Sequence, residues 1–142
     1  MVEMVITMIV AGLLALLSFP TLSGAMSQKA AWNARAIAIS MYSRARASAA
    51  ETGRATTLSW NANVAVITAT PRITVGGAGT LDTIGSTQDF NRLYGVTVTG
   101  NPGPSLTIDP RGLGSSASTT VFFTRNGNRD SVIVTGYGRV VK

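Results

Sequence analysis

Cysteine and histidine are both absent from the 142 residues of this chain. Without cysteine there are no disulfide bonds or thiol nucleophiles, without histidine there is no Ser-His-Asp arrangement, and without both nearly all zinc sites are excluded. Acidic residues are few, and no two lie close enough in sequence to suggest acid–base catalysis or a calcium loop. The six are Glu3, Glu51, Asp82, Asp89, Asp109 and Asp130. We therefore predict that the chain is not an enzyme and holds no metal or cofactor.

Charge is missing altogether from Met4 to Gln28. A helix of about 20 apolar residues spans the hydrocarbon core of a bilayer, so residues 1–28 are predicted to cross a membrane. A secretory signal peptide fits poorly, because such peptides begin with positive charge and no Lys or Arg precedes Lys29. Glu3 at the edge of this segment is either a functional carboxylate that needs a partner or a group that rests among lipid head groups.

The alanine-rich segment after Gln28 predicts that the same helix continues to about residue 52. One apolar stripe of this helix is predicted to pack on a sheet; it consists of Trp32, Ala36 and Ile39, which recur at spacings of four and three. A second set of residues widens the stripe. That second set is Ile37, Met41 and Ala45. Gly53 is the predicted helix end. Pro20, which has no backbone donor, is predicted to kink or locally melt the helix.

Short strands separated by Gly, Pro and Asn are predicted from Arg54 onward. They are Ala55–Trp60, Val64–Thr70, Ile73–Val75, Tyr94–Thr99, Leu106–Ile108, Thr119–Arg125, Ser131–Gly136 and Arg139–Lys142. Turns at 61–63 and at Asn126-Gly127-Asn128 fit a meander of hairpins, and the glycine-rich stretch from Gly76 through Gln88 is predicted to be a surface loop. The predicted class is α+β: residues 1–28 form the membrane or filament half of a long helix, and residues 29–142 form a globular domain with a helix packed on an antiparallel sheet.

Several motifs resemble those of the type IV pilin-like proteins. Val2-Glu3-Met4-Val5-Ile6, the apolar run after it and Pro20 resemble the start of a mature type IV pilin or type II secretion pseudopilin. The carboxyl third resembles the GspH/FimT family of minor pseudopilins and minor pilins, through Leu106–Gly112, the Asn-Gly hairpin and Gly136-Tyr137-Gly138-Arg139-Val140. The family pattern begins Phe-Thr-Leu-(Ile or Val)-Glu after a basic leader, and this chain enters it at the third residue.

The resemblance implies a subunit that assembles into a filament. Glu3 would attract the α-amine of a neighbouring subunit, which gives a buried carboxylate its charge partner, and Pro20 is the second residue that the resemblance implies in assembly. The implied partners are other pilin or pseudopilin subunits and, for the leader, a prepilin peptidase. The implied location is the bacterial inner membrane, with one pass and a periplasmic carboxyl domain, or the filament itself.

Positive charge gives the main alternative. Beyond residue 28 there are twelve basic and five acidic residues, an excess that could attract a polyanion. Arg125, Arg129, Arg139 and Lys142 would cluster if the last hairpin and the tail are adjacent, and they are the candidate DNA contacts. Some FimT-type pilins bind DNA through a Gly-Arg-x-Arg tail, which Gly138-Arg139-Val140 matches except that Val141 occupies the fourth place.

Three interpretations therefore remain open. The first is a structural minor subunit of a type IV pilus or type II secretion pseudopilus, whose basic surface only keeps the domain soluble and oriented near anionic lipids. The second is a minor pilin that displays a DNA-binding surface for DNA uptake. The third is a membrane-tethered domain unrelated to filaments.

Overall fold

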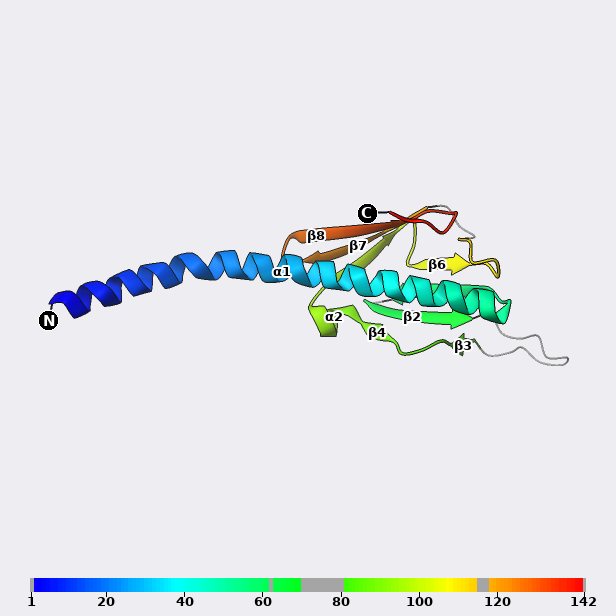
Figure 1. Ribbon diagram of the computed structural model, residues 1–142, viewed down its shortest axis with the longest axis horizontal. Coiled ribbons are helices and arrows are strands. Elements are labelled where there is room, and N and C mark those ends of the chain that lie inside the picture. Colours follow the sequence, from blue (N-terminus) through cyan, green and yellow to red (C-terminus); the bar gives the residue numbers. More distant parts are fainter. Residues whose placement is uncertain (1, 62, 70–80, 115–117, 142) are drawn as a thin grey trace.

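A long helix precedes a domain of short antiparallel strands (Figure 1), as the α+β prediction requires. The computed structural model describes residues 2–61, 63–69, 81–114 and 118–141, with only the backbone of residues 17–21 and 69. The helices are α1 (Val2–Thr52) and α2 (Phe90–Tyr94). The strands are β1 (Thr56–Asn61), β2 (Val64–Ala69), β3 (Asp82–Thr83), β4 (Gln88–Asp89), β5 (Thr97–Asn101), β6 (Ser105–Ile108), β7 (Thr119–Arg125), β8 (Asn128–Val134) and β9 (Val140–Val141).

Helix α1 is one uninterrupted element of 51 residues. It ends at Thr52, directly before Gly53 with φ 62°, so the predicted end is confirmed. The prediction that Pro20 melts the helix locally is wrong, because the backbone is helical before, at and after this residue. A proline removes one backbone donor and adds one steric conflict, and a gentle curve of the amino-terminal half accommodates it (Figure 1).

The face of α1 that packs on the sheets is made mostly of alanine. Ala31, Ala34, Ala45 and Ala49 are at most 1% exposed, and they repeat at helical spacing. Trp32 is 52% exposed, so its predicted place on the packed stripe is wrong. Alanine lets the helix backbone approach the sheets closely, and a side chain as large as tryptophan has room only outside that contact.

The strands form two sheets instead of a single meander. One sheet has the order β3-β2-β1-β6, with β4 also paired to β2, and the other has the order β5-β7-β8-β9. All pairs are antiparallel. The meander prediction fails at β5 and β6, which follow each other in the chain but lie in different sheets. Strand β6 pairs with β1, with Leu106 opposite Leu58.

The β7–β8 hairpin confirms the predicted Asn-Gly turn. Arg125 pairs with Asn128, so the turn consists of Asn126 and Gly127 alone, with φ values of 46° and 81°. Positive φ at both positions is typical of a type I′ turn, whose twist matches that of the strands. Asn126 Nδ2 donates to Ser27 Oγ at 3.3 Å, and Ser27 is buried. The hairpin tip therefore contacts α1 where the helix first becomes covered.

Short helix α2 replaces the start of a predicted strand. The strand was expected from Tyr94, but Tyr94 ends α2 and β5 begins at Thr97. The Asp89 carboxylate accepts from the backbone N–H of Arg92 at 2.9 Å and caps the helix, and Gly95 ends it. An Asp cap and a terminal Gly are ordinary helix signals, but a single turn is too short to show periodicity.

The segment between β2 and α2 differs from the predicted loop. The predicted strand Ile73–Val75 and residues 76–80 lie outside the described residues. From residue 81 to Gln88 the chain contributes β3 and the first residue of β4, both paired with β2. These pairings extend the first sheet, so this part is not simply a surface loop.

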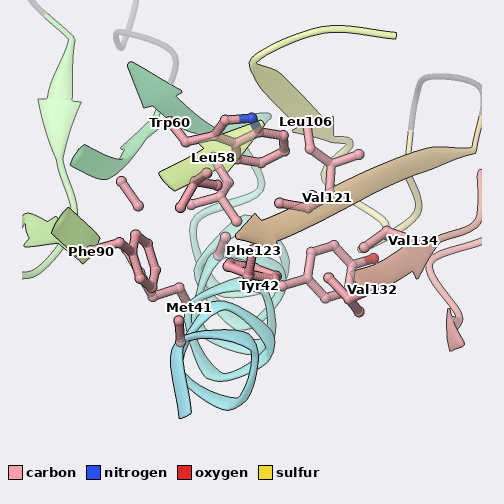
Figure 2. Packing of buried hydrophobic residues seen from close by; sticks show 14 of the residues in the cluster. Met41, Tyr42, Leu58, Trp60, Phe90, Leu106, Val121, Phe123, Val132 and Val134 are labelled. Atoms are coloured by element: carbon pink, nitrogen blue, oxygen red, sulfur yellow. The ribbon is translucent and has the colours of Figure 1, made fainter. Parts of the chain in front are cut away.

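The core lies where α1 crosses both sheets (Figure 2). Phe90 and Phe123 pack with ring centroids 6.0 Å apart, and each is at most 1% exposed. Thr56 Oγ1 in β1 donates to the Ala45 carbonyl of α1 at 2.9 Å, so it satisfies a buried polar group at the junction. The space left among these side chains is about 30 Å³, roughly the volume of one water molecule. The described side chains therefore fill the core closely.

Candidate functional site

The amino-terminal half of α1 exposes apolar side chains on all sides. We call residues 2–26 the apolar arm; Glu3 is their only charged residue. Its exposed large side chains are Val2, Met4, Val5, Ile6, Met8, Ile9, Val10, Leu13, Leu14, Leu16, Leu22 and Met26. A helix that is apolar all round is stable only when something covers it, and contiguous apolar patches of this extent mark interaction surfaces. The arm is the strongest candidate site of the molecule.

Glu3 lies in the first turn of α1, where the helix dipole favours a negative charge. Its side chain is exposed, and it makes no ion pair with any described residue. Nothing is within 4 Å of the point where a side chain on Gly12 would begin, so the arm also has a place for close approach by another helix. The roles predicted for Glu3 and Pro20 in assembly stay predictions, and the Pro20 side chain lies outside the description.

Within the described ranges of the chain, neither helix combines the length and the mean hydropathy of a membrane span. The predicted membrane-spanning role of residues 1–28 is therefore not confirmed.

Of the four predicted DNA contacts, the three that the structure describes do not form one cluster. Arg125 donates to the Tyr94 carbonyl at 2.6 Å, and the Arg129 guanidinium stacks 3.6 Å from the centroid of the Phe122 ring. Both lie at the turn end of the β7–β8 hairpin. Arg139 follows the opposite end of β8, roughly 20 Å away along the strand, and Lys142 lies outside the described residues. The tail is therefore not adjacent to the turn end of the hairpin, where Arg125 and Arg129 lie.

A different set of arginines shares one surface. Arg46 of α1, Arg111 of the turn after β6 and Arg139 of the tail line a hollow of about 730 Å³, which we call the basic groove. Its other lining residues are Tyr42, Ser43, Ala47, Ala50, Gly112, Gly138 and Val140. None of the described residues that line it is acidic. Arg139 is one of the DNA contacts predicted from the sequence. The sequence does not indicate Arg46 and Arg111, because only folding brings these three segments together.

The floor of the basic groove contains a buried polar atom without a partner. Tyr42 is 3% exposed, and its Oη has no hydrogen-bond partner among the described residues. Its ring lies in the core, with the hydroxyl on the β8 side (Figure 2). Burial raises the pKa of the Tyr42 phenol, while the positive charge of Arg46 opposes this shift. The hydroxyl therefore stays protonated at neutral pH and is available as a donor.

Glycine at position 138 brings the tail close to this hydroxyl. A Cβ added to Gly138 would lie 3.0 Å from Tyr42 Oη and 3.2 Å from the Gly112 carbonyl oxygen. The same point is 3.8 Å from Cζ of Arg46. Any larger residue would push the tail away from α1, so glycine here keeps the three walls of the groove together.

The described residues contain no group of three or more His, Cys, Asp or Glu side chains that could hold a metal ion. Residues 2–61, 63–69, 81–114 and 118–141 also show only two salt bridges. Arg35 pairs with Asp130 at 2.9 Å, and Arg54 reaches Asp82 at 3.9 Å. Both salt bridges lie outside the basic groove, so neither involves its three arginines.

Comparison with known proteins identifies a similar fold. No protein-family model matches the sequence, and a search of curated proteins gives no match. Among solved structures, the chain is similar to the crystal structure of the type IV minor pilin FimU of Pseudomonas aeruginosa strain PAO1, with a TM-score of 0.58 and 19% identity. The match covers 86% of this chain and 91% of FimU. At this identity the likeness shows a pilin-like fold and nothing finer, so the GspH/FimT assignment stays a prediction.

Proposed function

We propose that this chain is a structural, non-enzymatic minor subunit of a type IV pilus or a related secretion pseudopilus. The apolar arm carries the proposal. It extends α1 beyond the two sheets, which together we call the β-domain. It exposes large apolar side chains and contains a single charge near its start. The helices of other subunits would cover these side chains and remove them from water, at about 25 cal/mol for each Å² buried. The likeness in fold to a minor pilin supports the same conclusion.

Glu3 has a defined role in this proposal. Its carboxylate enters an apolar bundle during assembly, and a buried charge is tolerated only when it is paired. The amino group of an adjacent subunit is the proposed partner. Glu51, which lies in the last turn of α1 and is exposed, provides a matched control because it is the only other acidic residue of the same helix.

The test is recovery of the chain in sheared filaments from cells that express the full-length protein. We expect Glu3→Ala to lower incorporation at least about tenfold, which corresponds to 1.4 kcal/mol, while Glu51→Ala is incorporated as well as wild type. Equal incorporation of the Glu3 variant would remove the role of the carboxylate. Absence of the wild-type chain from filaments would refute the proposed function itself.

Inner-membrane residence and processing by a prepilin peptidase stay predictions of the sequence, and fractionation of the same cells tests both. The choice between a pilus and a secretion pseudopilus is tested by deleting each machinery in turn and measuring incorporation. The DNA-uptake alternative also stays a prediction.

A further inference from the structure

We propose that the basic groove is a docking site for an acidic segment of another subunit in the same filament. This inference rests on the proposed function and extends it from the arm to the β-domain. Arg46, Arg111 and Arg139 are the residues that would bind the carboxylates of that segment. Guanidinium groups suit this task because each presents several donors in a planar array that matches a carboxylate.

Charge is the first observation that supports an acidic partner. Three other arginines of the domain have internal contacts: Arg35 pairs with Asp130, and the guanidinium groups of the two hairpin arginines bind a carbonyl or stack on an aromatic ring. The three groove arginines make no ion pair within the described part of the chain. They come from three separate segments and surround a space without a negative charge. Such a site attracts an anion and is incomplete without one.

The nearest acidic residue in sequence does not complete the groove. Asp109 precedes Arg111 by two positions, and its Oδ1 accepts from the backbone N–H groups of Arg111 and Leu113, both at 2.9 Å. Its carboxylate is thus engaged in shaping the turn. No other described residue near the groove in sequence supplies a carboxylate to its lining.

The unpaired Tyr42 hydroxyl is the second, independent observation. A buried hydroxyl without a partner costs free energy, and this one lies at the floor of the groove, beside Arg46 and under Gly138. A partner that binds in the groove and displaces the tail slightly would accept a hydrogen bond from this hydroxyl. The groove therefore has a polar floor as well as charged walls.

The position and shape of the groove favour a protein segment as occupant. One wall is α1 itself, through Ser43, Ala47 and Ala50, so the groove continues the helix that the proposed function places against other subunits. Its volume of about 730 Å³ far exceeds that of a single small anion and accommodates several side chains. The alanines supply apolar contact for the stem of a glutamate or a neighbouring apolar side chain.

Photocrosslinking in assembled filaments tests the inference. Ala47 is exposed and lines the groove, so p-benzoylphenylalanine at this position reports what occupies it. In sheared filaments we expect crosslinks to a segment of another filament subunit that has at least two Asp or Glu residues near the crosslinked position. Mass spectrometry identifies that segment.

Charge-neutralising variants supply the specificity test. Arg46→Gln and Arg111→Gln should each lower the crosslink yield at least about fivefold, which corresponds to 1 kcal/mol. Arg92→Gln, which removes an exposed arginine of α2 outside the groove, should leave the yield unchanged.

Crosslinks to nucleic acid, crosslinks to a segment without acidic residues, or no crosslink in filaments that contain the chain would each overturn the inference and leave the proposed function intact. Equal loss with Arg92→Gln would also overturn it. If the chain never enters filaments, the proposed function fails and this inference fails with it.

Discussion

Replacing Tyr42 by phenylalanine should stabilise the protein. The substitution keeps the buried ring and removes only Oη, which has no hydrogen-bond partner among the described residues. An unsatisfied buried polar group costs about 1–3 kcal/mol. In the wild type, packing of the hydroxyl at this 3% exposed site offsets part of that cost. We therefore expect Tyr42→Phe to raise the free energy of unfolding by about 1 kcal/mol at neutral pH.

The same substitution should remove a pH dependence. Burial raises the pKa of the folded Tyr42 above its usual 10.0, although Arg46 opposes the shift. The unfolded chain therefore loses this proton at lower pH than the folded chain does, and stability falls as the pH rises above about 10. The phenylalanine variant lacks this loss. Its advantage over wild type should thus grow as the pH is raised from about 8 to about 11.

Urea unfolding of the full chain in a nonionic detergent, which covers the apolar arm, measures both effects. The fluorescence of Trp60, which is 6% exposed, reports unfolding of the core. Tyr137→Phe is the control, because Tyr137 is 87% exposed and its substitution should change the free energy by less than about 0.5 kcal/mol. A loss of more than about 1 kcal/mol in Tyr42→Phe at neutral pH would show that the hydroxyl has a partner and refute the reasoning.

Three further substitutions test the packing by the same urea assay. Asp130→Asn should lower the free energy of unfolding by about 1–3 kcal/mol, because Arg35 loses its ion-pair partner at 2.9 Å and its side chain is only 11% exposed. No change would mean that water replaces the carboxylate. Ala45→Leu should cost about 1–3 kcal/mol, since this fully buried alanine lets α1 approach the sheets, and a neutral result would imply a looser contact than described. Gly127→Ala should cost about 1–2 kcal/mol, because φ of 81° disfavours a Cβ, and an unchanged midpoint would contradict the type I′ turn.

Local features of this fold could be predicted from sequence. The helix end at Gly53 and the Asn126-Gly127 turn each depend on a few adjacent residues whose backbone preferences are strong. The exposed face of α1 was harder to predict. Trp32 and the alanines both count as apolar, and only the closeness of the helix to the sheets decides that alanine faces inward.

Features that depend on distant segments could not be predicted. Nothing near Leu106 in sequence indicates that β6 pairs with β1 instead of continuing from β5, because alternation fixes the face of a strand but not its neighbour. One candidate site is likewise local in sequence, and the other depends on distant segments. The arm and Glu3 are visible as a run of residues, whereas the groove joins Arg46, Arg111 and Arg139 across 93 positions of the chain.

The boundary at Ser27, where α1 passes from exposed to covered, has a consequence for how the protein can change. From Val2 to Leu16 every residue is exposed, and among the side chains that the structure describes the first buried one is that of Ser27. Folding of the β-domain therefore gains nothing from the far end of the helix, and the far end is free of the sequence constraints of the core. Substitutions in one part should leave the other unaffected, so variants can change the surface of the domain while the exposed apolar surface of the helix stays the same.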